Sequence, residues 1–255
     1  MIQYVLTPSA GKRLIGKAVA ERITKSKAIK SATIAIIAGT TNGYIAEELL
    51  LNLGQSEDFC RKRFFRGITP SPGITTTKSG RFPDESQFPG DVIIQNGTWL
   101  KGKTIYDIKG NLQTGDIIIK GANCVNLCSK KAGVLIGHPE GGTIIAALQA
   151  NIGKRVELII PVGLEKRVCD DIDSIALSLN SPKATGPRLI PVTGNIITEL
   201  QAIHYLSGCN ANLVSAGGVL GAEGAVWIAI EGNDRQLKQA KQLLDSVIEE
   251  PLFAI

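Results

Sequence analysis

The sequence predicts an α/β protein with a mostly parallel open sheet flanked by helices, followed by a small α+β subdomain. Three observations predict this fold. Residues 116–143 contain two short apolar runs, 117–119 and 133–136, and each run ends in a glycine-bearing turn. Residues 32–53 read as a strand, a glycine turn and a helix. The composition then shifts to NSPKATGP near residues 180–187, which indicates a domain boundary.

The composition is typical of a globular protein and argues against one class of partner. Of the 255 residues, 44% are hydrophobic and 20% are charged, and the formal net charge is +5. The basic residues are spread along the chain, apart from the short cluster RKRFFR at residues 61–66. Because nucleic-acid binders usually concentrate basic residues on one face, we expect no nucleic-acid partner. A small anionic molecule would suit this charge equally well.

The cysteine count and the N-terminal residues indicate a compartment. Five cysteines are an odd number, and the first residues, MIQYVLTPSAGKRL, lack the pattern of a signal peptide. No run approaches the roughly 18 apolar residues that a membrane helix needs. We therefore expect a cytoplasmic protein with reduced thiols and no membrane partner.

The first strand–turn–helix unit contains a candidate anion site. Pro8 can open a helix over about residues 9–24, and the β-branched run at 32–38 predicts a buried strand. The turn GTTNG follows it, and helix-start amides in such a unit hold phosphate groups. A tight turn that merely caps the helix is the open alternative. The predicted phosphate-binding residues are Gly39, Thr40, Thr41, Asn42 and Gly43.

Residues 67–91 are dense in Gly, Pro, Ser and Thr, which predicts a long loop. Such a loop is either a lid over a binding site or a surface excursion, and the sequence does not choose between them. The short strands expected between residues 91 and 120 should add hairpin-like pairs to the main sheet.

The segment 116–143 organises the predicted site. If the runs 117–119 and 133–136 are neighbouring parallel strands, the turns KGAN and GHPEGGT lie at their carboxyl ends, where open α/β sheets bind ligands. His138 could then act as acid, base or phosphate ligand, and Glu140 could move a proton, although a structural histidine is the open alternative. Thr143 could cap the next helix. The predicted ligand-binding residues here are Lys120, Gly121, Asn123, Gly141, Gly142 and Thr143.

The next elements repeat this pattern. A helix is expected over 143–152 and a strand over 156–162, and the strand is followed by the turn GLEKR at 163–167. Lys166 in that turn is a further candidate contact to an anion, whereas Arg167 reads as a solvated charge at a strand end. Because each major strand ends in a glycine turn, the turns should meet in one crevice.

The C-terminal part predicts a βαββα order, which is typical of a ferredoxin-like subdomain. We therefore expect a main domain over residues 1–182 and a subdomain over residues 183–255. Asn233 or Asp234 should cap the last helix. The expected elements are strand 188–192, helix 197–206, strand 211–216, loop 217–224, strand 225–231 and helix 234–248.

The order of the elements and three of the loops resemble the superfamily of ribose-5-phosphate isomerase and class I CoA transferases, whose main sheet is Rossmann-like. The turn GTTNG resembles the first phosphate loop of that superfamily. The segment IIIKGANCVN resembles the isomerase strand that ends in Asp-Gly-Ala-Asp-Glu, where this chain has Lys120, Gly121, Ala122, Asn123 and Cys124. The glycine and alanine match, and the acidic residues are replaced. The resemblance implies a sugar phosphate or an acyl-CoA as the ligand.

The same resemblance implies a role for Glu223. In the transferases a glutamate in a glycine-rich loop attacks the thioester. Here the loop AGGVLGAEGA places glycines on both sides of Glu223. A solvent-facing glutamate in a tight turn is the open alternative.

We therefore expect an enzyme that acts on a small anionic metabolite, with His138, Glu140 and Glu223 as the catalytic residues. A non-catalytic ligand-binding or sensor protein and a structural protein are the alternatives. No GxSxG elbow, P-loop or GxGxxG in the proper context occurs. Cys124 and Cys128 lack a second ligand pair, so no metal site is expected. The sequence identifies no cofactor, and it leaves open whether the protein is a homo-oligomer.

Overall fold

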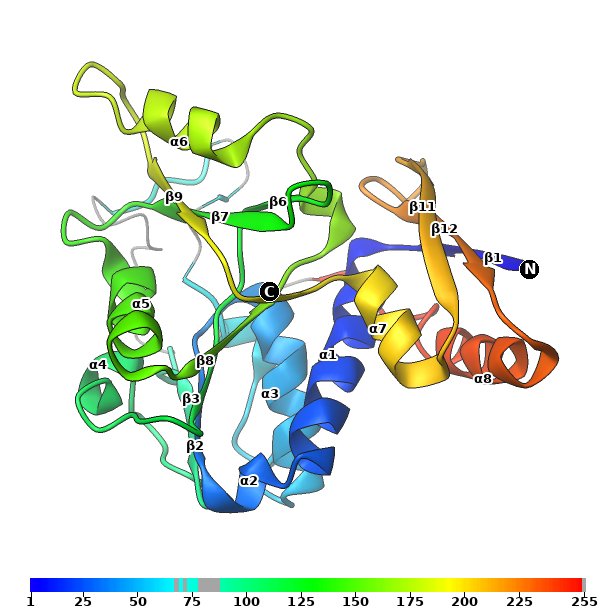
Figure 1. Cartoon of the computed structure of the whole chain (residues 1–255), viewed down its shortest axis with the longest axis horizontal. Coiled ribbons are helices and arrows are strands. Elements are labelled where there is room, and N and C mark those ends of the chain that lie inside the picture. The colour runs from blue at the N-terminus through cyan, green and yellow to red at the C-terminus, as the bar shows by residue number, and fades with distance from the viewer. Residues whose placement is uncertain (67–68, 71–72, 78–87, 254–255) are drawn as a thin grey trace.

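A computed structural model describes residues 1–255 except 67–68, 71–72, 78–87 and 254–255 (Figure 1). Most of the loop expected over residues 67–91 therefore lies outside the described residues. The described strands form one six-stranded sheet and two three-stranded sheets. The chain is thus a mixed α/β protein.

The six-stranded sheet is mostly parallel and has the order β10-β8-β5-β2-β3-β4. Its parallel strands are β2 (Thr33–Ile36), β5 (Ile117–Ile119), β8 (Glu157–Pro161) and β10 (Asn195–Ile197). The antiparallel strands β3 (Val92–Gln95) and β4 (Thr98–Trp99) extend one edge, as expected for the block between residues 91 and 120.

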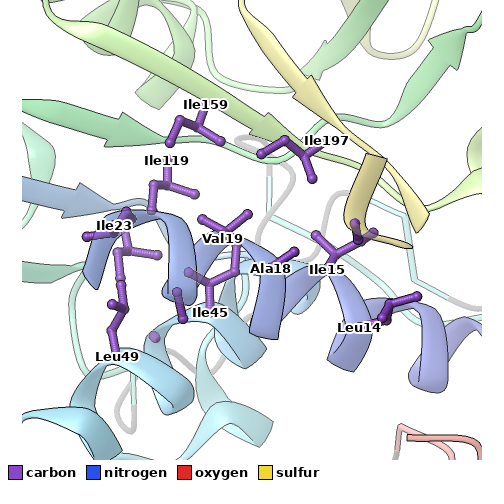
Figure 2. Close-up of a cluster of buried hydrophobic side chains, with 14 of the residues drawn as sticks. Leu14, Ile15, Ala18, Val19, Ile23, Ile45, Leu49, Ile119, Ile159 and Ile197 are labelled. Atoms are coloured by element: carbon purple, nitrogen blue, oxygen red, sulfur yellow. The ribbon is translucent and has the colours of Figure 1, made fainter. Parts of the chain in front are cut away.

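Two layers of helices cover this sheet because its strands are apolar on both faces. On one face Ile119 and Ile159 pack with Val19 and Ile45, as Figure 2 shows. On the other face alternate residues of the same strands, such as Ile118, belong to a second core cluster. The first face is covered by α1 (Pro8–Lys25) and α3 (Thr40–Asn52), and α5 (Gly142–Lys154) and the short α4 (Ile105–Ile108) lie on the second.

One expected strand lies in a different sheet. The run 133–136 was expected beside 117–119 in the parallel sheet, but it belongs to the antiparallel sheet β6-β7-β9. A parallel neighbour needs a crossover of about a dozen or more residues, whereas a tight turn pairs β7 directly with β6. The bounds are β6 (Cys124–Asn126), β7 (Lys131–Ile136) and β9 (Arg188–Val192), with α6 (Ile172–Leu179) beside β9.

The third sheet joins both ends of the chain, with the order β1-β12-β11 and antiparallel pairing throughout. Strand β1 was not expected from the sequence. The strands of this third sheet are β1 (Ile2–Leu6), β11 (Asn210–Ala216) and β12 (Val226–Glu231). Helices α7 (Glu199–Ser207) and α8 (Asp234–Asp245) lie beside the sheet (Figure 1). Asn233 caps α8, as predicted.

Strand pairing crosses the boundary expected at residues 182–183. From the C-terminal part, β9 pairs with β7, β10 with β8 and β12 with β1. The remaining short elements are α2 (Ala28–Ser31) and the 3-10 turns η1 (Arg61–Arg63) and η2 (Leu164–Lys166). None of the helices in the described part of the chain is long and apolar enough to cross a membrane. All five cysteines are free thiols.

Candidate functional site

A cavity of about 620 Å³ opens at the carboxyl edge of the parallel strands. The turns that follow β2, β5, β7 and β8 all contribute to its wall, so the four glycine turns that were expected to meet do line one cavity. This holds although β7 belongs to another sheet. From these turns the lining residues are Gly39, Thr40, Thr41, Asn42, Lys120, Gly121, Ala122, Asn123, Gly137, His138, Gly141, Gly142, Thr143 and Lys166.

Two helices start at the cavity without a side-chain cap. Helix α3 begins after Gly39, and its first intrahelical amide bond runs from Gly43 N to Gly39 O. Helix α5 begins after Gly141, whose φ is 82°. The first-turn N–H groups of a helix have no backbone partner within it, and the helix dipole makes this end positive. Both helix starts therefore favour an anion in the cavity.

The cap expected at Thr143 is wrong, because the N-cap of α5 is Gly141. The backbone has positive φ at both Gly141 and Gly142, a conformation that suits glycine and resists other residues. A Cβ atom at Gly141 would also lie 2.2 Å from Cγ1 of Ile145. Thr143 is consequently the second residue of the helix.

Lys120 follows β5 and stands partly buried in the cavity wall. Its Nζ donates a hydrogen bond of 3.2 Å to Gly121 O. Loss of solvent lowers the pKa of Lys120 to about 8, and the positive charges of Arg66 and Lys166 act in the same direction, against the charge of Asp91. Near neutral pH the amine and ammonium forms therefore coexist.

The side chain of Asp91 connects three segments of the chain at this end of the cavity through hydrogen bonds. The side chain is fully buried, and Oδ1 accepts hydrogen bonds from Ala38 N (2.9 Å) and from an Nη atom of Arg66 (2.8 Å). Its Oδ2 accepts from Ile105 N at 2.9 Å. Sequence reasoning missed both Asp91 and Arg66. The available signal was an aspartate directly before the buried run VIIQ, where a lone carboxylate needs partners.

Asn42 joins the ends of two parallel strands. Its Nδ2 donates to Ile37 O at 2.7 Å and to Ile119 O at 3.2 Å, so it fixes the position from which Lys120 leaves β5. Its Oδ1 is buried and has no hydrogen-bond partner among the described residues, and the same is true of Thr41 Oγ1. Asn123 has a comparable structural role, because its Oδ1 accepts from Leu135 N at 3.0 Å.

The turn that carries His138 is fixed from two sides. An Nη atom of Arg188 donates to Gly137 O at 3.1 Å and to His138 O at 2.9 Å. His138 Nδ1 accepts a hydrogen bond of 3.1 Å from Glu140 N. In the neutral imidazole the proton is therefore on Nε2, which leaves this atom as a donor.

Lys166 reaches the cavity from η2, and the charges of Glu165 and Glu199 act on it. Its Nζ donates to Ala122 O at 3.1 Å, and burial lowers the pKa of Lys166. Glu199 is fully buried and accepts from Leu164 N at 2.9 Å. Burial raises the pKa of Glu199 to about 8, and the charge of Glu165 contributes.

Glu165 lacks a full complement of partners. Neither of its buried carboxyl oxygens has a hydrogen-bond partner among the described residues, and the nearest cation, Lys12 Nζ, lies 4.0 Å from Oε1. Sequence reasoning missed Glu165 and Glu199 as site residues. Glu165 stands in the predicted turn GLEKR, but Glu199 was hidden in a segment that reads as an ordinary helix.

Three predicted site residues do not face the cavity. Glu140 is exposed, and its side chain is not part of the lining. Gly43 lies inside α3, where a Cβ atom would come within 3.1 Å of Cβ of Arg61, so it serves helix packing. Glu223 is exposed between β11 and β12 and accepts a hydrogen bond from Gly221 N at 2.9 Å, the geometry of a tight turn.

Within the described residues no three His, Cys, Asp or Glu side chains are grouped so that they could hold a metal ion. Comparison of the chain with protein-family models, with curated proteins and with solved structures finds no match.

Proposed function

We propose that the protein is an enzyme that binds a small anionic metabolite in the cavity at the carboxyl edge of its parallel sheet. One observation supports this most strongly: two uncapped helix starts and two partly buried lysines, Lys120 and Lys166, line the same cavity. Amide dipoles and cations at one place favour a phosphate or carboxylate group. By the resemblance of its loops, the ligand is a sugar phosphate or an acyl-CoA.

Lys120 has no carboxylate bonded to its Nζ within the described residues. Asp91 is the carboxylate that acts on Lys120, but it already accepts hydrogen bonds from Arg66 and two backbone amides. A cationic cavity of this kind attracts anions, and a bound anion would stabilise the ammonium form of Lys120.

The volume of the cavity and its apolar lining residues suit a small metabolite. A volume of about 620 Å³ lies within the range of roughly 300–1,000 Å³ that is usual for small-molecule sites. The cavity is also lined by apolar side chains, which would contact the carbon skeleton of the ligand. They include Phe65, Ile74, Val134, Ile136, Ile144 and Phe253.

His138 is the candidate proton carrier, because its Nε2 is free of the turn that holds Nδ1. A second candidate function is a non-catalytic binding or sensor protein. The positions of Glu140 and Glu223 outside the cavity favour it, since they remove two of the three catalytic residues expected from the sequence. A cytoplasmic location, a Rossmann-like main sheet, a ferredoxin-like C-terminal part and membership of the isomerase and CoA-transferase superfamily are proposals of the same kind.

A thermal-shift screen tests the binding. The panel contains phosphorylated sugars, CoA and acyl-CoAs, nucleotides and simple carboxylates. A ligand that binds the folded state at 100 times its Kd should stabilise that state by about 2.7 kcal/mol and so raise Tm. We expect one class to shift the wild type, Lys120→Met to lose the shift, and Lys238→Met, which changes an exposed lysine on α8, to keep it.

A screen in which no ligand shifts the wild type, or in which Lys120→Met responds like the wild type, would contradict the proposed site. Chemical analysis of the ligand after incubation separates the two candidate functions. A converted ligand identifies an enzyme, and an unchanged ligand identifies a binding protein.

A further inference from the structure

The amine of Lys120 is held in an unusual setting. It lines the cavity, and its Nζ donates a hydrogen bond of 3.2 Å to the backbone oxygen of the neighbouring Gly121. The charges that act on it are Arg66 and Lys166, which are like charges, and Asp91, whose oxygens are already occupied. Among the described residues no carboxylate accepts a hydrogen bond from Lys120 Nζ, so the amine is available to a ligand in the cavity.

We propose that Lys120 is a catalytic nucleophile that forms a Schiff base with a carbonyl group of the bound anion. The proposal rests on the proposed function, because the anion-binding wall would hold the ligand while its carbonyl carbon meets Nζ. It narrows the substrate class to aldehydes and ketones that carry a phosphate or a carboxylate.

The chemistry is complete without an oxidant or reductant. The neutral amine of Lys120 attacks the carbonyl carbon, a C–N bond forms, and one amine proton moves to the carbonyl oxygen to give a carbinolamine. The C–O bond then breaks, the oxygen leaves as water after accepting a second proton, and the protonated imine remains; return of its N–H proton to the donor gives the neutral imine. Lys166 and His138 line the same cavity and can supply that proton.

The protonation state of Lys120 supports this role. Amines attack carbonyl groups only in the neutral form, and the pKa of Lys120 is lowered to about 8 by burial and by the neighbouring cations. At pH 7 the neutral fraction is about 300-fold larger than for a lysine of ordinary pKa. Desolvation and an adjacent cation are the two general ways in which proteins activate a lysine nucleophile.

Lys166 is a less suitable nucleophile although it shares the cavity. Burial lowers the pKa of Lys166 as well, but the charges of Glu165 and Glu199 act against this shift and favour the ammonium form. Its Nζ also donates to Ala122 O at 3.1 Å. This places the nucleophile at Lys120 and leaves Lys166 as an anion contact or proton donor.

Reductive trapping tests the assignment. The full chain is incubated near pH 8 with pyruvate, glyoxylate or dihydroxyacetone phosphate in the presence of cyanoborohydride, and the labelled peptide is identified by mass spectrometry. Reduction of the imine adds the mass of the probe less one oxygen atom. We expect one adduct, on Lys120, at probe concentrations that leave the exposed Lys238 unlabelled.

Two variants separate covalent chemistry from binding. Lys120→Arg keeps the positive charge but cannot form an imine, so it should lose the adduct and retain a thermal shift with the same probe. Lys238→Arg, which changes an exposed lysine outside the cavity, should still be labelled at Lys120. Label on Lys166 or spread over surface lysines, or a probe that shifts Tm without forming an adduct, would overturn the Schiff base and leave anion binding intact. The Schiff-base proposal is also overturned if the wild type shows neither a thermal shift nor an adduct with any of the three probes. In that case the thermal-shift screen of all ligand classes decides whether the proposed anion binding fails as well.

Discussion

The side chain of Glu199 lies in a buried environment that favours the neutral carboxylic acid over the carboxylate. It is fully buried beside Glu165, and its pKa is raised from an ordinary 4.5 to about 8. Between these two values the folded chain binds more protons than the unfolded chain, so the free energy of unfolding falls as the pH rises. The stabilising contribution of the proton is fully present below about pH 4.5 and is lost as the pH passes through about 8.

Replacing this carboxyl group should therefore change the pH dependence of stability. Glu199→Gln keeps an oxygen that can accept from Leu164 N and stays neutral at every pH. We expect its Tm to be close to that of the wild type at about pH 5 and higher at about pH 8.5. Thermal unfolding at both pH values measures this, with Glu223→Gln on the surface as the control. Parallel Tm curves for Glu199→Gln and the wild type would show that Glu199 titrates normally.

Lys120 should destabilise the folded protein when no ligand is bound. Its pKa is lowered from 10.5 to about 8, so the folded state disfavours the ammonium form, and this penalty is fully present below about pH 8 and disappears as the pH rises towards 10.5. Lys120→Met removes the charge and keeps an unbranched chain. We expect it to raise Tm in ligand-free protein at about pH 7 while it abolishes ligand binding. A lower Tm at pH 7 would mean that the ammonium group stabilises the fold.

At the scale of elements, the sequence predicts the strands that are buried on both faces and the helices that follow them. The runs at β2, β5 and β8 are continuous and β-branched or apolar, and glycine turns end them. The sheet to which β7 belongs was not predictable in this way. An apolar run shows that a strand is buried, but its partner depends on the tertiary position of β9, which lies more than fifty residues later.

The packing of α1 on α3 depends on a close approach at Gly16. A Cβ atom there would lie 3.0 Å from Cβ of Tyr44 and 3.1 Å from its backbone carbon, which is tighter than ordinary contact. Gly16→Ala should therefore destabilise the protein by roughly 1–3 kcal/mol, the usual cost of overpacking, less the gain in helix propensity. Urea unfolding measures the difference.

Gly153→Ala is the matched control for that change. Gly153 also lies in a helix, α5, and no atom comes within 4 Å of a Cβ placed there. Alanine should stabilise this position by roughly 0.5–1 kcal/mol because it restricts the unfolded chain and suits a helix. If both variants gain stability, the helices are not as closely packed at Gly16 as described.

At the scale of the whole molecule, the C-terminal part is joined to the rest by strands and by charges. Glu250, which follows α8, accepts from Arg13 Nε on α1 and from an Nη atom of Arg61 on η1, both at 2.8 Å. Arg13 also binds Glu47 of α3. The largest core cluster includes residues of both the parallel sheet and the sheet that contains β1 and β12.

Unfolding should consequently be a single cooperative transition. Residues 183–255 contribute β9 and β10 to sheets whose other strands lie before them, so a fragment 183–255 would expose unpaired strands and apolar surface. We expect a ratio of van't Hoff to calorimetric enthalpy of about one for the full chain, and no dispersed NMR spectrum for the fragment. Two calorimetric transitions, or a folded fragment, would instead support independent domains.

The candidate site was predictable from the sequence only in part. The glycine turns mark strand ends, and strand ends of a parallel sheet share one edge, so the meeting of these turns could be expected. The positions of Glu140 and Glu223 could not, because loop residues a few places from a lining residue can face solvent. Asp91, Arg66 and Glu199 were missed because partners far apart in the sequence decide which polar groups a core can bury.

Hydrogen–deuterium exchange with the ligand that gives the largest thermal shift tests the central claim, that the carboxyl-edge cavity binds an anion. Exchange is compared with and without ligand in the wild type. We expect protection together in residues 38–43, 120–123 and 137–144, which form the glycine-turn wall. Protection confined to residues 195–212, which line a second cavity beside α7, or no local protection at all, would contradict the assignment of the site.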